Sequence, residues 1–346
     1  MDKRLVKQKK PTYHKKEYIR KEKIDMCDLM KATSDGMREL EVYHDESYRK
    51  GKQWFMVGLL WINSRQRHRI AEGLQRSREY NCYYGRIHYR TLTDHSSKRK
   101  TAIEWFRIAT DHLRDNLQFY LLAVDRTHPK YEYTRFGCRF HEYNRLTSIA
   151  LFTSYRWFFP RNLPSRIVFL SDSKTRRPVG DETGNGIITD NFEEYLPRRF
   201  ASDISKKQRT TDIPLLKDHP QDSIKYTLLS HIAGVRTIDA RNEHVEERPE
   251  EEEMIQLCDL LLGSFGSAML EPFPLRAKRV KRSMCMKAKK LIEDLEKEPW
   301  KQKYHLHKRL SVGYFPDDQG KIYQRKAPSS SEKETSLTEW ITCTDP

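Results

Sequence analysis

The chain has 346 residues, of which 37% are hydrophobic and 33% are charged, so it can bury a core and is not disordered overall. Its formal net charge of +16 favours polyanionic partners, with nucleic acid ranked before an anionic membrane. No stretch approaches the ~20 apolar residues of a membrane span, and the first residues lack the apolar segment of a secretory signal. A cytoplasmic protein without a membrane partner is therefore expected.

Several common classes of site are excluded by missing motifs. The six cysteines are scattered without a CxxC pair, which argues against zinc ribbons and a disulfide scaffold. The chain also lacks GxGxxG and Walker sequences, which argues against dinucleotide enzymes and P-loop ATPases.

Three regions are predicted from the distribution of charge. Residues 1–38 are rich in lysine and arginine and are expected to form a solvated basic arm, which is compatible with nucleic-acid contact. Residues 39–318 are predicted to form one domain with helical insertions. Residues 319–346 are predicted to be a polar tail.

The first elements predict an antiparallel hairpin followed by a helix. Residues 40–47 and 53–62 have the apolar patterns of strands, and a short connection with a glycine joins them. Asn63 is a suitable N-cap for a helix over residues 64–80. Residues 86–90 alternate between polar and apolar side chains, which predicts a third strand.

The middle of the chain predicts a helix over 98–115, a strand over 117–124, an aromatic helix over 139–159 and a buried strand over 167–170. The order of strands and helices predicts a mixed α/β fold.

The last part predicts a helix over 191–204, one or two short strands within 224–238, a helix that Pro249 opens, a basic helix over 276–298 and an edge strand over 311–315. The acidic residues 242–253 are interpreted as a solvated helix start rather than as a source of metal ligands.

Four aspartates form the candidate catalytic group. Asp45, Asp125 and Asp172 each end a predicted apolar strand, and Asp259 lies in a helix that is apolar nearly all round. A buried carboxylate needs a proton or a positive partner, and Mg²⁺ or Mn²⁺ prefers such oxygen ligands. The alternative is that the strand-end aspartates form turns and that Asp259 is a salt-bridged core residue.

Two short sequences, which lie far apart in the chain, resemble one family. Residues 43–47, Tyr-His-Asp-Glu-Ser, resemble the opening Tyr-x-Asp-Glu-Ser-Gly of the prokaryotic domain of unknown function 3800 family. Residues 256–260, Gln-Leu-Cys-Asp-Leu, are similar to its closing Gln-Leu-Ala-Asp-Leu. The strand ends at Asp125 and Asp172 occupy the places of two further family motifs. Tyr48 departs from the pattern, because the family has glycine there.

The resemblance implies a ribonuclease-H-like mixed sheet with flanking helices and a metal-dependent nuclease acting on DNA or RNA. Asp45, Asp172 and Asp259 would bind the metal, and Glu46 or Asp125 would complete the site. The family's association with phage defence and mobile elements adds the expectation of a protein partner in a defence complex.

A dense basic group follows the Asp259 helix and is predicted to bind the phosphate backbone. It comprises Arg276, Lys278, Arg279, Lys281 and Arg282. A solvated helix face is the alternative. His88 is a candidate for proton transfer, although an ordinary core or surface histidine fits the sequence as well.

Two other functions remain open at this point. One is a non-catalytic nucleic-acid-binding subunit on the same fold, in which the acids are relics or determinants of the fold. The other is a phosphohydrolase acting on a nucleotide, which the lack of a nucleoside-binding loop disfavours.

Overall fold

The computed structural model describes residues 38–49, 53–113, 117–132, 136, 139–159, 165–172, 179–180, 187–188, 191–210, 230–240, 249–270, 278–297, 306, 309–316 and 323–324. The chain divides into two units, Met1–Gly36 and Met37–Pro346, and every described residue belongs to the second. The predicted basic arm, apart from Arg38, therefore lies outside the described residues. So does the predicted tail, apart from Tyr323 and Gln324.

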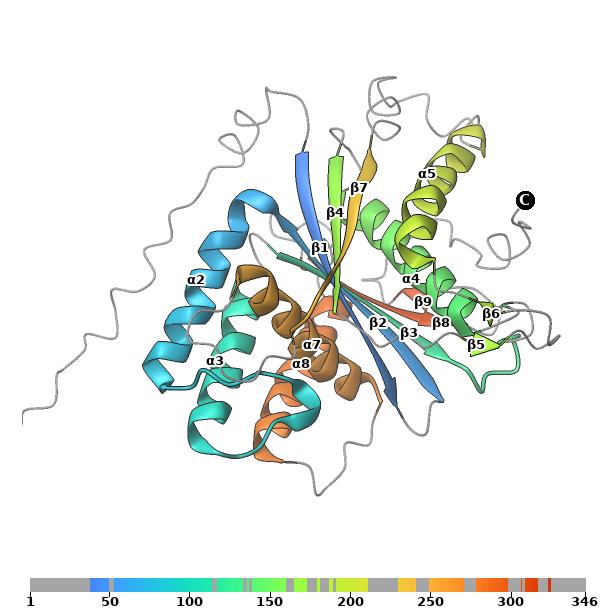
Figure 1. The fold of residues 1–346 in the computed structure, drawn as a ribbon. Coiled ribbons are helices and arrows are strands. Elements are labelled where there is room, and N and C mark those ends of the chain that lie inside the picture. Colours follow the sequence, from blue (N-terminus) through green and yellow to red (C-terminus); the bar gives the residue numbers. More distant parts are fainter. Residues whose placement is uncertain are drawn as a thin grey trace, which may run out of the picture. The chain divides into compact units, whose positions relative to one another are not determined.

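The described part of the second unit is built on a seven-stranded sheet in the order β7-β4-β1-β2-β3-β8-β9 (Figure 1). Its strands are β1 (Arg38–Arg49), β2 (Trp54–Asn63), β3 (Leu117–Asp125), β4 (Ser165–Asp172), β7 (His231–Ile238), β8 (Leu310–Phe315) and β9 (Tyr323–Gln324). A separate ladder pairs β5 (Val179–Gly180) with β6 (Ile187–Ile188). Strands β1, β3, β4, β7 and β8 are parallel, while β2 and β9 run against them.

Helices cover both faces of this sheet (Figure 1). One face carries α2 (Ser64–Asn81), α3 (Ser96–His112), α7 (Glu250–Met269) and α8 (Arg279–Lys297), and the other carries α4 (Arg139–Phe158) and α5 (Phe192–Thr210). The prediction of a mixed α/β sheet with flanking helices is confirmed. None of the described helices combines the length and the apolarity that crossing a membrane requires.

Alternation along each strand divides the core into two layers. In β1, Tyr43 packs with α7, whereas Leu40 and Val42 pack on the α4 side. The α4 layer is rich in aromatic rings; Trp61, for example, donates from Nε1 to Ser154 Oγ at 2.9 Å. The aromatic side chains of α4 therefore pack in the core, and helices cover a buried hydrophobic cluster on each face of the sheet.

Most predicted elements are present, with ends shifted by a few residues. The prediction that Asp45 ends the first strand is wrong, because β1 continues to Arg49 in its hairpin with β2. Asn63 caps α2 by accepting a hydrogen bond from the Arg65 amide at 3.1 Å. The prediction of an edge strand over 311–315 is wrong, because β9 pairs with the outer side of β8. The predicted strand over 86–90 is also wrong: this segment is extended at His88, continues into the 3-10 helix η1 (Tyr89–Thr91) and belongs to neither sheet.

Candidate functional site

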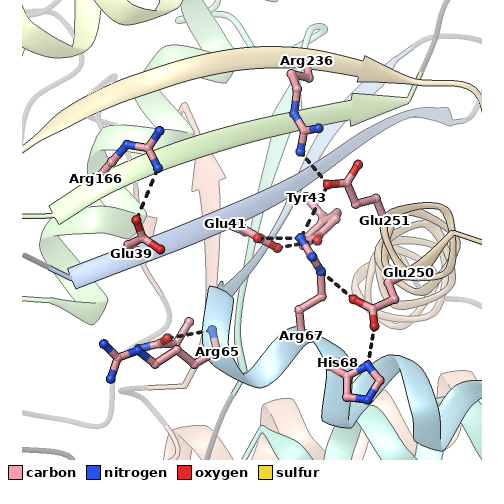
Figure 2. Close-up of polar contacts among 11 residues, drawn as sticks. Glu39, Glu41, Tyr43, Arg65, Arg67, His68, Arg166, Arg236, Glu250 and Glu251 are labelled. Atoms are coloured by element: carbon pink, nitrogen blue, oxygen red, sulfur yellow. Dashed lines mark hydrogen bonds and ion pairs between the residues drawn. The ribbon is translucent and has the colours of Figure 1, made fainter. Parts of the chain in front are cut away.

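Helix α7 begins at a cluster of ion pairs centred on Arg67 of α2 (Figure 2). Arg67 Nη1 lies 2.8 Å from Glu41 Oε1 on β1, and Nε lies 2.8 Å from Glu250 Oε2 in the first turn of α7. Tyr43 donates to the other oxygen of Glu41 at 2.6 Å. These contacts join α7 to α2 and to β1.

A buried arginine makes a second link between α2 and α7. The Arg78 side chain is 1% exposed, and its Nε donates to Glu253 Oε1 at 2.8 Å. Its Nη2 donates to Gln256 Oε1 at 3.0 Å, and its guanidinium lies 4.5 Å from the centre of the Trp105 ring. The interpretation of this acidic stretch as a solvated helix start is therefore wrong at Glu253.

These links set the position of α7 along β1. Asp259 lies nine positions after Glu250, about 13.5 Å along the helix, and Asp45 lies four positions after Glu41, about 13 Å along the strand. Between these ends, Cys258 Sγ donates to the Tyr43 carbonyl oxygen at 3.2 Å. Because these helix and strand segments are about equally long, Asp259 lies next to Asp45.

The centre of the site is the carboxylate pair of Asp45 and Asp259. Their carboxyl groups lie within hydrogen-bonding reach of each other, an arrangement that favours a proton on Asp259. Burial raises the pKa of Asp259 well above its usual value, and the neighbouring Asp45 charge raises it further. Without a cation, Asp259 therefore keeps its proton to a higher pH than an isolated aspartate would.

Asp172 lies beside this pair on the adjacent parallel strand. His44 pairs with Ser171, so Asp45 and Asp172 follow at the same level and on the same face of the sheet. One oxygen of Asp172 lies 3.8 Å from Arg86 Nη2. The Asp172 side chain is 15% exposed and that of Asp259 is 19% exposed, so solvent and small ions reach the site.

His88 borders the same group. Burial lowers its pKa to about 4, and the charge of Arg86 acts in the same direction. Its Nδ1 accepts from the Arg90 amide at 3.1 Å, so the ring is neutral with its proton on Nε2. Nδ1 also lies 3.4 Å from Asp259 Oδ2. His88 Nδ1 and Asp259 Oδ2 both accept hydrogen bonds, and they can lie this close when Asp259 is protonated and carries no charge. The raised pKa of Asp259 agrees with this.

Asp259 also has a structural role, which it shares with Gln256. Gln256 Oε1 accepts from the Ile87 amide at 2.8 Å, and Asp259 Oδ2 accepts from the Tyr89 amide at 2.6 Å. Two side chains of α7 thus replace the hydrogen bonds that a neighbouring strand would have given. The Gln-x-x-Asp spacing suits this task, because residues three apart lie on one side of a helix.

A glycine in α7 makes room for Tyr89. A Cβ at position 263 would lie 2.1 Å from Tyr89 Cγ, closer than real atoms approach. The Tyr89 hydroxyl also donates to Ser267 Oγ at 2.9 Å, which fixes the ring on the helix.

Gly263→Ala is expected to destabilise the protein by about 1–3 kcal/mol, the usual cost of overpacking, because the Tyr89 ring has to move. Urea denaturation checks this expectation. Gly234→Ala is the matched control, since a Cβ at position 234 meets no atom within 4 Å. Equal midpoints for the two variants would contradict the assigned contact.

The structure does not bring Asp125 to the pair. Asp125 lies opposite Trp54, four residues beyond the level of Asp45, and its Oδ1 accepts from the Thr127 amide at 2.9 Å. Asp125 therefore forms a turn, which is the alternative to a metal ligand that the sequence leaves open. Glu46 follows Asp45 directly, so it belongs to the opposite face of the sheet, with Leu40 and Val42.

The basic residues of α8 begin close to η1. Lys281 Nζ donates to the Arg90 carbonyl oxygen at 2.9 Å and lies 5.3 Å from the centre of the Tyr89 ring. Lys278, Arg279 and Arg282 are exposed. Arg276 lies outside the described residues.

Within the described part of the chain, no three histidine, cysteine, aspartate or glutamate side chains are grouped so that they could hold a metal ion. The expected cluster of three or four ligands is therefore not formed there. Mg²⁺ usually takes only one or two carboxylates and completes its shell with water and substrate phosphate. The carboxyl pair of Asp45 and Asp259 fits that smaller requirement.

The sequence interpretation missed three residues of this site: Arg78, Arg86 and Gln256. Arg86 lies inside the alternating segment 86–90, and Gln256 lies inside the closing motif, residues 256–260. Gln256 and Asp259 are two hydrogen-bond acceptors on one face of α7, and this spacing could have indicated that the helix binds the backbone of another segment. Arg78 gives no such signal, because its partners are distant in the sequence.

The chain matches no family model, and no curated protein and no solved structure is significantly similar to it.

Proposed function

We propose that this chain is a nuclease that hydrolyses phosphodiester bonds of DNA or RNA with Mg²⁺ or Mn²⁺, on a ribonuclease-H-like fold. The observation that carries the proposal is the contact between the carboxyl groups of Asp45 and Asp259. Such a contact is unfavourable for two charges unless a proton or a cation lies between them. A resemblance to the domain of unknown function 3800 family supports the same conclusion.

The sheet order supports the fold assignment. Strands β3-β2-β1-β4-β7 are consecutive, and only β2 runs against the others. Strand β4 ends at Asp172, and Asp45 lies at the same level on the parallel β1, which continues to Arg49 in its hairpin with β2.

Each side chain is assigned one task. Asp45 and Asp259 would hold the metal ion, with Asp172 available as a third ligand once it leaves Arg86. When bound, the ion would lower the pKa of a water and stabilise the leaving oxygen. Arg86, which neutralises Asp172 here, would contact the phosphate. His88 is neutral at pH 7 with its proton on Nε2, so it would donate a hydrogen bond from Nε2 to the phosphate or to a water rather than transfer a proton.

Purified protein is expected to cleave single- or double-stranded DNA or RNA when Mg²⁺ or Mn²⁺ is added and not in EDTA. Asp45→Asn is expected to reduce cleavage on the order of 10²–10³-fold, the scale for removing one charge-stabilising group. Calorimetry should also show Mn²⁺ binding that strengthens as pH rises, because binding must release the proton of Asp259. Wild-type cleavage by the Asp45→Asn variant would overturn the site.

The alternative is a non-catalytic nucleic-acid-binding subunit. Two observations favour it: Asp259 accepts from the Tyr89 amide, and Arg86 already neutralises Asp172. In that case Mn²⁺ would not bind, while salt-sensitive binding to nucleic acid would remain. Association with phage defence, mobile elements or a protein partner has no support beyond the family resemblance.

A further inference from the structure

The segment next to the acidic pair presents its side chains alternately. Gly85, Ile87 and Tyr89 are buried. The side chains between and beside them reach the surface: Tyr84 and Arg90 are exposed, and Arg86 and His88 are half-buried. The side chains on the surface side of this segment are therefore, in order, Tyr84, Arg86, His88 and Arg90.

This segment is held in place from three sides. Gln256 and Asp259 of α7 bind the Ile87 and Tyr89 amides. Arg78 Nη1 of α2 donates to the Gly85 carbonyl oxygen at 2.6 Å, and Lys281 of α8 binds the Arg90 carbonyl oxygen. The outward side chains thus stand on a fixed backbone, which lowers the entropy lost when a ligand binds.

The spacing of these side chains suits an extended polynucleotide. Arg86 and His88 precede η1, on a backbone that is extended at His88, and alternate residues of such a backbone lie about 6.6 Å apart, similar to the separation of consecutive phosphates in an extended single strand. Arg90 lies inside η1 and follows His88 at a shorter spacing. Tyr84 is 37% exposed, and it is one of three large hydrophobic residues that the described part of the chain leaves exposed. An exposed tyrosine beside cations is the combination that binds single strands through base stacking and phosphate contact.

We propose that residues 84–90 form the track for a single strand of nucleic acid, in which Tyr84 stacks on a base and Arg86, His88 and Arg90 follow the phosphates past Asp45 and Asp259. This inference rests on the proposed nuclease function and names its substrate as an unpaired strand. A duplex keeps its bases stacked inside the helix, so Tyr84 has no base face to contact there.

The test measures binding separately from cleavage. Fluorescence anisotropy in EDTA, where cleavage does not occur, compares labelled single-stranded DNA, single-stranded RNA and the corresponding duplexes. Wild-type protein is expected to bind a single strand at least about tenfold more tightly than a duplex. Tyr84→Ala is expected to weaken single-strand binding about tenfold, within the range for losing one base stack, and to leave duplex binding unchanged.

Two tyrosine variants act as controls. Tyr84→Phe keeps the aromatic face and should bind like wild type. Tyr80→Ala removes the other strongly exposed tyrosine, 87% exposed on α2, and should have no effect. Arg90→Ala should lower the salt dependence of binding by about one phosphate contact.

Tighter binding to duplexes, or unchanged binding by Tyr84→Ala, overturns the track. If cleavage is found together with either result, the proposed nuclease stands and only the track fails. If the track is supported but no metal-dependent cleavage occurs, the proposed function fails and the binding site remains. The DNA and RNA arms show which sugar the track accepts.

Discussion

Asp259→Asn is expected to make the protein more stable at pH 7–8 in EDTA while abolishing cleavage. Asparagine can still accept from the Tyr89 amide and donate to Asp45, as protonated aspartate does, but it never carries a charge. The gain should be about 0.5–2 kcal/mol, the range for relieving a strained functional site. Thermal unfolding from pH 4 to pH 8 measures it.

The sign of the pH dependence follows from proton binding. The pKa of Asp259 is raised in the folded protein above its usual 3.8, so the folded state binds more protons than the unfolded state. Wild-type stability should therefore fall as pH rises from about 3.8 towards the raised pKa. Arg86 and the neutral His88 face the same pair, and neither removes this slope. The Asp259→Asn variant should lack it.

Asp125→Asn is the matched control, because it makes the same change at an aspartate that ends β3 and accepts a hydrogen bond in its own turn. It should leave cleavage and the pH dependence unchanged, since asparagine can accept the same hydrogen bond. If Asp259→Asn were less stable than wild type at pH 8 in EDTA, the protonation of Asp259 would be refuted.

Arg78→Leu is expected to cost about 3–5 kcal/mol of stability, the range for breaking a buried ion pair on one side. Glu253 would remain buried without the arginine charge, and the carbonyl oxygens of Tyr83 and Gly85 would both lose the hydrogen bond from Arg78 Nη1. Urea denaturation gives the loss. Because Arg78 also supports the segment with Arg86 and His88, cleavage should fall at temperatures where the variant is still folded.

Arg76→Ala on the same helix is the control. Arg76 is exposed and pairs with Glu72 one turn away, and such surface pairs contribute only about 0–1 kcal/mol. The combined change Arg78→Leu with Glu253→Leu should cost less than Arg78→Leu alone, because it removes the buried acid together with its arginine. A single change at Arg78 that costs as little as Arg76→Ala would contradict the assigned network.

Local patterns were sufficient for most of the elements. The apolar runs of β2 and β3, the Asn63 cap of α2 and the aromatic α4 follow from side-chain periodicity and capping, which depend on neighbours within a few residues. The segment over residues 86–90 shows where this reasoning stops. Its alternation is real, but its hydrogen-bond partners are side chains of a helix 170 residues further along the chain.

The sequence by itself determined that Asp125 and Asp172 end apolar strands and that Asp259 lies in an apolar helix, because burial follows from the pattern of neighbouring side chains. Only the tertiary structure decided which of them meet. Arg67 and Arg78 fix α7 against β1 so that Asp259 reaches Asp45, while Asp125 lies four residues further along the sheet and caps a turn. Ion pairs between distant elements set that register, and no local pattern encodes them.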